Sequence, residues 1–580
     1  MKYELTDFQR DAVNQNGKVV LKACPGSGKT FVVSNRIIKL VRGWQEKNKG
    51  IALLSFTNVA HEEVIRKVKE VSGTEKLYYP HFSGTLDSFI SKFILLPFGH
   101  LIIGNNKKPR VIENESNEYC QFVKSQYRYQ CHKSMCNPLD FYIDESGCVK
   151  DMSNKMDKCL VSGTKPCVQL KNSMYRKGLI TYKDANIIAI KLLKIYPSIG
   201  KTLASRFPTI IIDEAQDTSS EQMEIINLLS SYGVENIMLI GDPDQAIYEW
   251  RDADPSVFLN KYNSGEWISK ELNENFRCSQ KICNATKIFS TLSSTSIAKG
   301  ESSQYGYKPR IVFYDRTKSS NLVQYFITEC INNNIEVSAD NVAILSRGRS
   351  GLLGKDYSRI GDLWKNTLTF LFASAAYERD YGSYKKAINM IERGLFLYFI
   401  DNSEDVREVD ESQVESILDI DIWNKLIRKF YVENPLSDTI LDDWIVEVKK
   451  VLSDISVKLG ISKVTGAEIK VKTRDTSCPD FRKQPIKNFF IKSISKDYLN
   501  STIHAVKGRT FEGVLLKLET NGKLTSNIIN KRDIESEEIR TAYVAMTRAK
   551  KILMIAIPNT VKERTLVRFP KSEWDIVKLD

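Results

Sequence analysis

The sequence predicts an α/β protein with two parallel-sheet domains, each carrying a mainly helical inserted subdomain. Short apolar runs typical of buried strands alternate with longer stretches of helical apolar spacing. Most of these runs end in polar loops, as parallel strands do at the sheet edge where ligands bind. Two long segments without this alternation interrupt the pattern. We therefore expect insertions at about 90–200 and about 348–497.

The composition is that of a large globular protein. With 580 residues, of which 42% are apolar and 27% charged, the chain can form several well-packed cores. Its net charge of +13 permits a nucleic-acid partner, but a basic solvated surface gives the same excess. The 11 cysteines, together with the lack of a signal segment or a membrane-length apolar run, predict free thiols in a reducing, cytoplasmic compartment.

The first apolar run leads into the stretch ACPGSGKT at residues 23–30, which opens a predicted helix. Such a turn directs main-chain N–H groups inward, and the start of the helix adds partial positive charge, so the turn suits a polyphosphate. Lys29 can reach the β- and γ-phosphates, and Thr30 can ligate Mg²⁺. The other residues expected around the phosphates are Ala23, Gly26, Ser27 and Gly28, with Ala23 in place of the usual first glycine. Taken alone, the stretch also fits a glycine-rich turn without a ligand.

A helix at 5–13 precedes this phosphate loop, with Thr6 or Asp7 as its N-cap. The amide of Gln9 can donate to and accept from an adenine edge at once, which neither a carboxylate nor an amine can do. We therefore predict that Gln9 reads the base. The alternative is a glutamine that faces solvent.

A second buried strand, predicted at 51–55, ends in Phe56 and Thr57. An aromatic ring beside a hydroxyl at a sheet edge suits a stacked base and a phosphate. The stretch GTLDSF at 84–89 has the same character. A core phenylalanine and an N-cap threonine are the alternative interpretation in both places.

Six cysteines lie between residues 90 and 200, where the strand–helix alternation is lost: Cys120, Cys131, Cys136, Cys148, Cys159 and Cys167. They form no CxxC pair, and Cys131 and Cys136 flank a single histidine, His132. Scattered thiols are therefore favoured over a metal or iron–sulfur site.

The strand predicted at 209–212 ends in Asp213 and Glu214, which places both carboxylates at the sheet edge. Beside a phosphate loop, Asp213 is suited to hold Mg²⁺, and Glu214 is suited to orient or deprotonate the attacking water. Two adjacent acids after a buried strand are costly to place without a cation. An N-cap or surface position is the alternative.

Another strand, predicted at 236–240, leads into the stretch GDPDQAIYEWR. Gln245 is placed to contact the γ-phosphate. Tyr248, Trp250 and Arg251 suit a stacking platform for nucleic-acid bases. Core packing of Trp250 is the alternative.

The second half of the chain repeats the strand pattern at 342–347, 514–518 and 552–556. A helix predicted at 540–551 carries Arg548. The segment between the first two of these strands is mostly helical, for example at 384–393, and charged faces of such helices are more often solvent-exposed than bound to DNA.

Nine motifs, in a fixed order, resemble those of superfamily 1A helicases of the UvrD/Rep type. They are the Gln9 motif, ACPGSGKT, SFTNVAHEEV, GTLDSF, DEAQDTSSEQ, GDPDQAIYEWRDADP, LNENFRCSQKI, STIHAVKGRTFEGV and EEIRTAYVAMTRAKK. The resemblance implies two RecA-like motor domains of the P-loop NTPase class with ATP and Mg²⁺ between them. The first domain is expected at 1–90 and 200–275 with 91–199 inserted, and the second at 276–347 and 498–580 with 348–497 inserted. It also implies ATP-driven movement along single-stranded DNA with 3′→5′ polarity. The two insertions match the family by position alone.

The resemblance also implies roles for individual residues. Lys29, Thr30, Asp213 and Glu214 match the phosphate, Mg²⁺ and water-activating residues, Gln245 matches a γ-phosphate sensor, and Phe276 matches an aromatic ring that stacks on adenine. Arg277 and Arg548 match two arginines that the second domain brings to the γ-phosphate, so that hydrolysis depends on closure of the cleft. Phe56, Thr57, Trp250, Arg251 and His504 match DNA-contacting positions, and Lys507 and Gly508 match the fifth motif.

Three departures from the family pattern affect nucleotide contacts and the DNA platform but leave the hydrolytic residues intact. Phe31 replaces an arginine after the phosphate loop, and Asp252 replaces a glycine after Trp-Arg. Thr510 replaces a glutamate that lies near the ribose, although Glu512 is close by.

The motif variants NFRC, IYEW and GRTFEGV, with little chain after the last motif, resemble the helicase subunit of Gabija-type anti-phage systems. That resemblance implies a partner ATPase–nuclease. Two other functions stay open on the sequence: a DNA-sensing regulatory ATPase subunit that gates a partner nuclease with little unwinding, and a P-loop ATPase that does not bind DNA.

Overall fold

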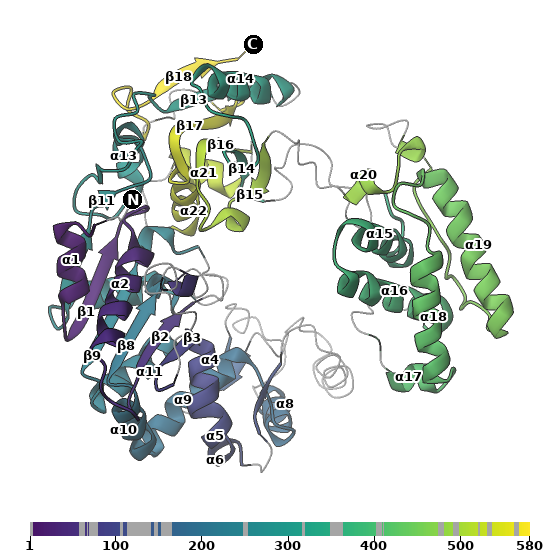
Figure 1. The fold of residues 1–580 in the computed structure, drawn as a ribbon, viewed down its shortest axis with the longest axis horizontal. Coiled ribbons are helices and arrows are strands. Elements are labelled where there is room, and N and C mark those ends of the chain that lie inside the picture. Colours follow the sequence, from purple (N-terminus) through teal and green to yellow (C-terminus); the bar gives the residue numbers. More distant parts are fainter. Residues whose placement is uncertain are drawn as a thin grey trace. The chain divides into compact units, whose positions relative to one another are not determined.

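The computed structural model describes residues 4–56, 64–66, 68, 79–104, 108–112, 141–143, 149–151, 165–247, 253–315, 319–348, 363–401, 409, 411–473, 481–490, 498–519, 522–530, 536–561, 566 and 568–579. The chain divides into two compact units. The first unit contains two six-stranded sheets, and the second is a helical unit within Gly354–Ile494 (Figure 1).

The first sheet is parallel throughout. Its strand order is β10 (Ile268–Leu272), β1 (Lys18–Ala23), β9 (Asn236–Gly241), β8 (Thr209–Asp213), β2 (Ile51–Ser55) and β3 (Phe82–Thr85). The four inner strands, β1, β9, β8 and β2, are mostly apolar because helices cover both faces of the sheet, whereas the edge strands β10 and β3 contain polar residues. Val19 and Leu21 of β1 enter one core, and Val20 enters the other.

On one face of this sheet lie α1 (Asp7–Asn14) and α2 (Lys29–Arg42), and the described residues Val64 and Val68 pack into the same core. The opposite face packs against α4 (Leu86–Ile90), α9 (Tyr182–Ile195), α10 (Pro197–Arg206), α11 (Ser220–Ser231) and α12 (Pro255–Asn263) (Figure 1). Thr6 caps α1 and forms a capping box with Gln9, which confirms one of the two predicted N-caps. Thr85 caps α4 and Phe89 lies in the core, so the N-cap and core interpretation of GTLDSF is confirmed.

The segment between β3 and α9 adds short elements. They are a π-helical turn at Ser91–Leu95, α5 (Leu96–Phe98), α6 (His100–Ile103), α8 (Lys165–Arg176), the parallel pair β4 (Arg110–Val111) and β7 (Leu179–Ile180), and the antiparallel pair β5 (Phe141–Ile143) and β6 (Val149–Asp151). A buried ion pair of 2.8 Å joins Lys171 of α8 to Asp184 of α9.

The second sheet is also parallel throughout. Its strand order is β15 (Leu499–Thr502), β14 (Val342–Ser346), β16 (Phe511–Lys517), β17 (Ala549–Pro558), β13 (Arg310–Tyr314) and β18 (Asp575–Lys578). One face carries α13 (Gln280–Thr286), α21 (Lys523–Asn530) and α22 (Glu537–Met546), and the other carries α14 (Ser319–Asn332). A short parallel pair, β11 (Glu274–Asn275) and β12 (Ile297–Ala298), lies between the two sheets in the sequence. The two parallel sheets confirm the predicted α/β fold.

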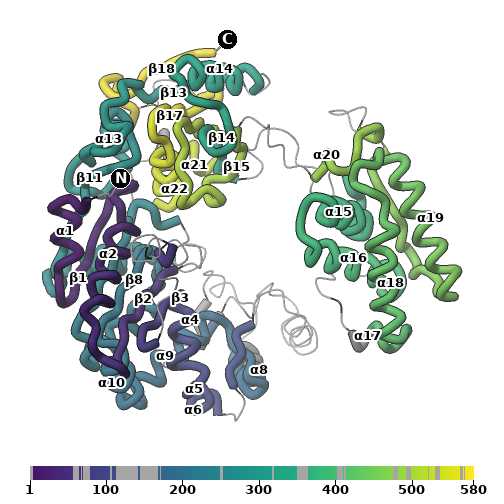
Figure 2. The backbone as a smooth tube through the Cα atoms, viewed as in Figure 1, coloured from purple at the N-terminus to yellow at the C-terminus, as the bar shows by residue number. Residues whose placement is uncertain are grey.

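The second sheet is assembled from two distant parts of the chain. Figure 2 shows β13 and β14, in teal, in the same sheet as β17, in yellow, and β16 pairs with both β14 and β17. The residues between β14 and β15 include the helical unit, whose helices are α15 (Thr367–Tyr381), α16 (Tyr384–Phe399), α17 (Glu411–Glu415), α18 (Ile420–Glu433), α19 (Leu441–Leu459) and α20 (Lys487–Phe490). Its core is separate from the others and contains Trp364, Trp423 and Trp444.

One predicted boundary is wrong. The helix predicted at 540–551 ends at Met546, with Thr547 as its C-cap, and β17 begins at Ala549. The parallel ladder explains the difference, because Phe511 of β16 pairs with Ala549 and its N–H donates to the carbonyl of Arg548 at 2.9 Å. Arg548 therefore lies in the turn between helix and strand.

Among the described cysteines, Cys24, Cys278, Cys283 and Cys330 are buried free thiols. Apart from the main chain of Cys167, the six cysteines of the first insertion lie outside the described residues. Within the described part of the chain, no helix has the length and apolar character of a membrane span.

Candidate nucleotide-binding site

The loops that follow β1, β8 and β9 leave the first sheet at the same edge. The ladder pairs Lys22 of β1 with Gly241 of β9, and Ser55 of β2 with Asp213 of β8. Because all these strands are parallel, the polar residues after them lie side by side. The sheet thus brings together the phosphate loop, the two acids and the loop with Gln245.

The phosphate loop is a tight turn from which α2 begins at Lys29. Gly26 and Gly28 have φ angles of 75° and 79°, which L side chains rarely adopt. A Cβ on Gly26 would lie 2.7 Å from the Cβ of Arg277, so the loop touches the segment that follows β11. The Ser27 hydroxyl is buried and has no hydrogen-bond partner among the described residues. A glycine turn, a helix start and an unpaired buried hydroxyl fit a polyphosphate group.

Gln9 lies against this loop and is only 3% exposed, so the solvent-facing alternative is wrong. Its Nε2 donates to the carbonyl of Ser27 at 3.0 Å, and its Oε1 accepts from the N–H of Thr6 at 3.2 Å. The amide is therefore fixed at the phosphate loop. Phe276, the predicted adenine-stacking ring, is 37% exposed, and its N–H donates to the carbonyl of Gly26 at 2.9 Å.

Glu214 has an unusual main chain. Its φ of 55° is in the left-handed region, which costs a non-glycine residue about 1–2 kcal/mol. Its N–H donates to Oδ1 of the preceding Asp213 at 3.0 Å. Burial raises the pKa of Glu214, but the charges of Lys29 and Lys507, the Gln216 hydrogen bond and Arg548 together lower it below its ordinary value. Glu214 is therefore an anion at neutral pH, the form that a general base needs.

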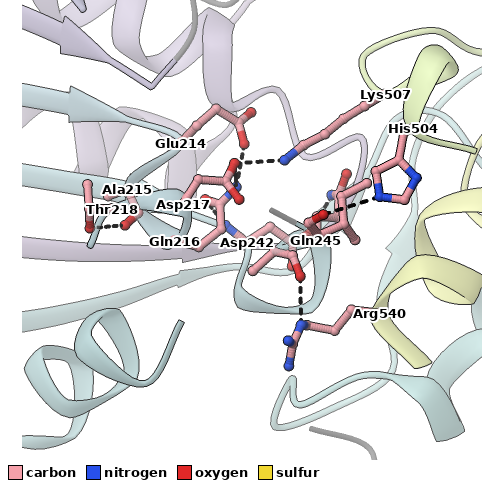
Figure 3. Close-up of polar contacts among 12 residues, drawn as sticks. Glu214, Ala215, Gln216, Asp217, Thr218, Asp242, Gln245, His504, Lys507 and Arg540 are labelled. Atoms are coloured by element: carbon pink, nitrogen blue, oxygen red, sulfur yellow. Dashed lines mark hydrogen bonds and ion pairs between the residues drawn. The ribbon is translucent and has the colours of Figure 1, made fainter. Parts of the chain in front are cut away.

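Gln216 is a fully buried amide that joins the acids to the next loop (Figure 3). Its Nε2 donates to Glu214 and to Oδ2 of Asp217, and its Oε1 accepts from the N–H of Asp242 at 3.0 Å. A carboxylate at this position could not donate to the two acids, so the contacts require an amide. A Cβ on Gly241 would lie 2.5 Å from Oε1 of Gln216, which leaves space there for glycine alone.

Gln245 meets Arg548 of the other sheet's domain. Its Oε1 accepts from Nη2 of Arg548 at 2.6 Å, and its Nε2 donates to Oδ2 of Asp242. Arg548 is 1% exposed and also donates to the carbonyls of Val544 and Arg509. Burial, and then the charge of Arg277, lower the pKa of Arg548 to about 9. The two arginines that the sequence predicted at the γ-phosphate thus lie close to each other.

Arg277 and Arg548 both lie near the phosphate loop and the acids. Arg277 touches Gly26 as described and donates from Nη1 to the carbonyl of Thr547 at 3.2 Å. Arg548 and Lys29 act together on the pKa of Glu214. Burial raises the pKa of Asp242 to about 7, against the opposing effect of Lys29. Cations from both sheets' domains therefore surround one group of carboxylates.

Three more side chains of the second sheet's domain point at these loops (Figure 3). Lys507 forms an ion pair of 2.7 Å with Oδ2 of the buried Asp217. His504 contacts the carbonyl of Ile247 through Nε2 at 3.3 Å. Arg540 donates from Nε to the carbonyl of Ala246 at 2.7 Å.

The predicted DNA-contacting residues are described in part. Phe56 is half-buried at the end of β2, and His504 is half-buried beside Arg347, at 3.4 Å from Nδ1 to Nη1. Burial and then Arg347 lower the pKa of His504. The other predicted contacts lie outside the described residues: Thr57, Tyr248, Trp250 and Arg251, together with Asp252.

The other departures from the family pattern have described surroundings. Phe31 is half-buried, with its Cβ 3.7 Å from the place of a Cβ on Gly28. Glu512 forms ion pairs with Lys550 at 2.8 Å and Lys551 at 3.0 Å. Its carboxylate is thus engaged with lysines of β17.

Sequence reasoning did not assign Gln216 or Asp217 to the site, and it did not single out Arg540, which contacts the loop beside the site. Gln216 and Asp217 stand directly after the two acids, so their position was a usable signal. Arg540 lies eight residues before Arg548 in the sequence, on the helix α22. The helix ends at Met546, before Arg548, so a helical spacing between the two arginines gave no signal for Arg540.

Two family models match this chain. The UvrD/REP helicase N-terminal domain matches residues 5–265, and the UvrD-like helicase C-terminal domain matches residues 493–560. Together they cover the first sheet apart from β10, the acids, Lys507, α22 and β17.

Curated relatives agree with these matches. The ATP-dependent DNA helicase Rep of Buchnera aphidicola is 25% identical over 95% of this chain and 93% of its own length. The ATP-dependent DNA helicase PcrA of Staphylococcus epidermidis is 22% identical over 95% of this chain and 83% of its own length. An ATP-dependent helicase/nuclease subunit of Listeria monocytogenes is 32% identical over 21% of this chain and 11% of its own length.

The ion pair between Lys507 and Asp217 predicts a pH-dependent cost of its removal. Burial raises the pKa of Asp217 from 3.8 to about 6, against the opposing charge of Lys507. Lys507→Met raises this pKa further and leaves a buried carboxylate without its cation, which costs about 3–5 kcal/mol. A carboxyl with a raised folded pKa contributes stability that is complete below its unfolded pKa and is lost as the pH rises through the folded value. We expect the loss in urea midpoint relative to wild type to be smallest near pH 4–5 and to grow toward pH 8.

The double variant Asp217→Asn/Lys507→Met is the control, because it has no titrating carboxyl at this place. Measured against Asp217→Asn alone, its loss in urea midpoint should be the same at about pH 6 and about pH 8, because Glu214, the other carboxylate that Lys507 stabilises, is ionised throughout that range. A loss for Lys507→Met that does not change with pH would contradict the role of Asp217.

Proposed function

We propose that this chain, which belongs to the UvrD/Rep-type helicases of superfamily 1A, is an ATP-dependent DNA helicase that moves 3′→5′ along single-stranded DNA. ATP hydrolysis takes place where the loops of the first sheet meet the cations of the second. The observation that carries the proposal is the contact between Gln245 and Arg548, because it joins the two sheets' domains beside the phosphate loop and the acids.

The proposed roles follow from the contacts. The phosphate loop holds the polyphosphate through main-chain N–H groups and Lys29, and Gln9 and Phe276 face the base. Thr30 and Asp213 would hold Mg²⁺, which neutralises phosphate charge when it is bound. Glu214, held as an anion, accepts the proton of the attacking water, and Gln216 fixes the direction of its carboxylate.

Arg277 and Arg548 supply positive charge to the phosphoryl group as it is transferred. Arg548 belongs to the second sheet's domain, so hydrolysis requires that domain to be docked on the loop of Gln245. Chemistry is thereby tied to a movement between the two sheets. The segment after Ile247, with Tyr248, Trp250 and Arg251, together with Phe56, Thr57 and His504, is proposed to hold the DNA strand.

A second candidate is favoured by the local match to the helicase/nuclease protein of Listeria monocytogenes. In this function the chain senses DNA through its ATP cycle and gates a partner ATPase–nuclease with little unwinding. For the pathway we propose anti-phage defence in the cytoplasm, which rests on the motif variants of the Gabija-type systems.

Removal of the proposed base tests the chemistry. Glu214→Gln should lower kcat for ATP hydrolysis at least about 100-fold, since general-base catalysis contributes on this scale. ATP affinity, measured by fluorescence titration, should stay within about threefold of wild type because the phosphate loop is unchanged. Glu224→Gln, on α11 away from the loops, is the matched control and should keep full turnover. Appreciable hydrolysis by Glu214→Gln would assign the base to another residue.

Strand displacement on tailed duplexes tests the movement. With ATP and Mg²⁺, we expect a duplex with a single-stranded 3′ tail to be opened and one with a 5′ tail or blunt ends to persist. Displacement confined to the 5′-tailed duplex would contradict the polarity. ATP hydrolysis stimulated by single strands without displacement of any duplex would favour the second candidate.

A further inference from the structure

Three successive residues of one loop are each held by a different side chain of the other sheet's domain. The side chain of Gln245 accepts from Arg548 at 2.6 Å, the carbonyl of Ala246 accepts from Arg540 at 2.7 Å, and the carbonyl of Ile247 contacts His504 at 3.3 Å. The next residues along the chain are those proposed to form the DNA platform. The loop therefore connects the nucleotide site to that platform.

The contact made by Arg540 is well defined. Arg540 is 4% exposed and belongs to α22, the helix that leads into Arg548. Ala246 has no exposed surface, so its carbonyl oxygen cannot obtain a hydrogen bond from solvent. The donor is Nε, the inner nitrogen of the guanidinium, and the residue that carries it lies within the helix.

We propose that Arg540 is a positioning residue that couples the nucleotide site to the DNA platform through the carbonyl of Ala246. This inference rests on the proposed function. One rigid helix carries Arg540 and leads into Arg548, so docking of α22 fixes the γ-phosphate arginine and the main chain before Tyr248 in one movement. Loss of the Arg540 contact leaves the hydrogen bond between Gln245 and Arg548 in place. It removes the hydrogen bond that holds the main chain of Ala246, from which the platform residues follow.

The chemistry of the side chain provides matched variants. In Arg540→Gln, the amide nitrogen is separated from the main chain by the same number of bonds as Nε of arginine, so the variant keeps a donor for Ala246 and loses the charge. Arg540→Met has a similar length and loses both. Arg540→Lys keeps the charge, but its only donor lies one bond further out. If Arg540 acted through packing or charge alone, the Gln variant would not be closer to wild type than the Met and Lys variants.

The first measurement needs no DNA. Hydrogen exchange of the peptide that contains Gln245, Ala246 and Ile247 is followed in full-length protein with a non-hydrolysable ATP analogue. Arg540→Met and Arg540→Lys should exchange these amides at least about tenfold faster than wild type, the scale expected from one buried charge-assisted hydrogen bond. Arg540→Gln should stay within about threefold of wild type. Equal exchange in the three variants would overturn the inference.

The second measurement separates coupling from chemistry. In Arg540→Met and Arg540→Lys, the KM for ATP and the turnover without DNA should stay within about threefold of wild type, and stimulation by single-stranded DNA should fall about tenfold. Arg540→Gln should recover most of the stimulation. Full stimulation of Arg540→Met would overturn the inference, as would an equal loss in the Met and Gln variants at equal melting temperature. If wild type shows no stimulation by DNA, the proposed function fails, and the exchange order still decides whether Arg540 positions the loop.

Discussion

The guanidinium of Arg548 is a buried charge whose hydrogen bond to Gln245 joins two separately built sheets. A buried cation is stable only where anions and acceptors surround it. The carbonyls of Val544 and Arg509 and the amide of Gln245 provide the acceptors, and Asp242 and Glu214 provide the nearby negative charge. Arg277 lies close by, so this region holds two guanidinium groups and Lys29. A bound polyphosphate would neutralise this concentration of positive charge.

The same constraint organises the acids. Glu214 adopts a strained main chain, and its carboxylate is held by Gln216, whose own oxygen is fixed by the N–H of Asp242. Strain of this kind persists only where the surrounding contacts determine the conformation. The network therefore links the loop after β8 to the loop after β9. Gln245 of the second loop is hydrogen-bonded in turn to Arg548, which follows α22. We therefore expect a change in the docking of α22 to alter the positions of both Glu214 and the loop that contains Gln245.

Much of the fold and of the nucleotide site could be predicted from the sequence, because many of their features depend on residues that are neighbours in the chain. The phosphate loop, the strands that end in Asp213 and Gln245, and the capped helix before Gln9 depend on neighbours in the chain. The C-terminus of α22 could not be predicted, because it depends on where β17 begins. That strand begins at Ala549, which pairs with Phe511 of a distant segment. Gln216 stands directly after the two acids, but its contacts and those of Arg540 could not be predicted from the sequence for the same reason. Their partners, Asp242 and Ala246, are adjacent only after the strands align and the second sheet docks.

The central claim is that one bound phosphate chain is held by the loop of the first sheet and by both arginines of the second. A crystal structure of the full chain with ADP, Mg²⁺ and a metal fluoride in place of the γ-phosphate measures this directly. We predict fluoride atoms within hydrogen-bond distance of Arg277, Arg548 and Gln245, with Lys29 on the opposite side. A fluoride group held by Lys29 alone, with Arg548 turned to the carbonyls of its own domain, would contradict the account.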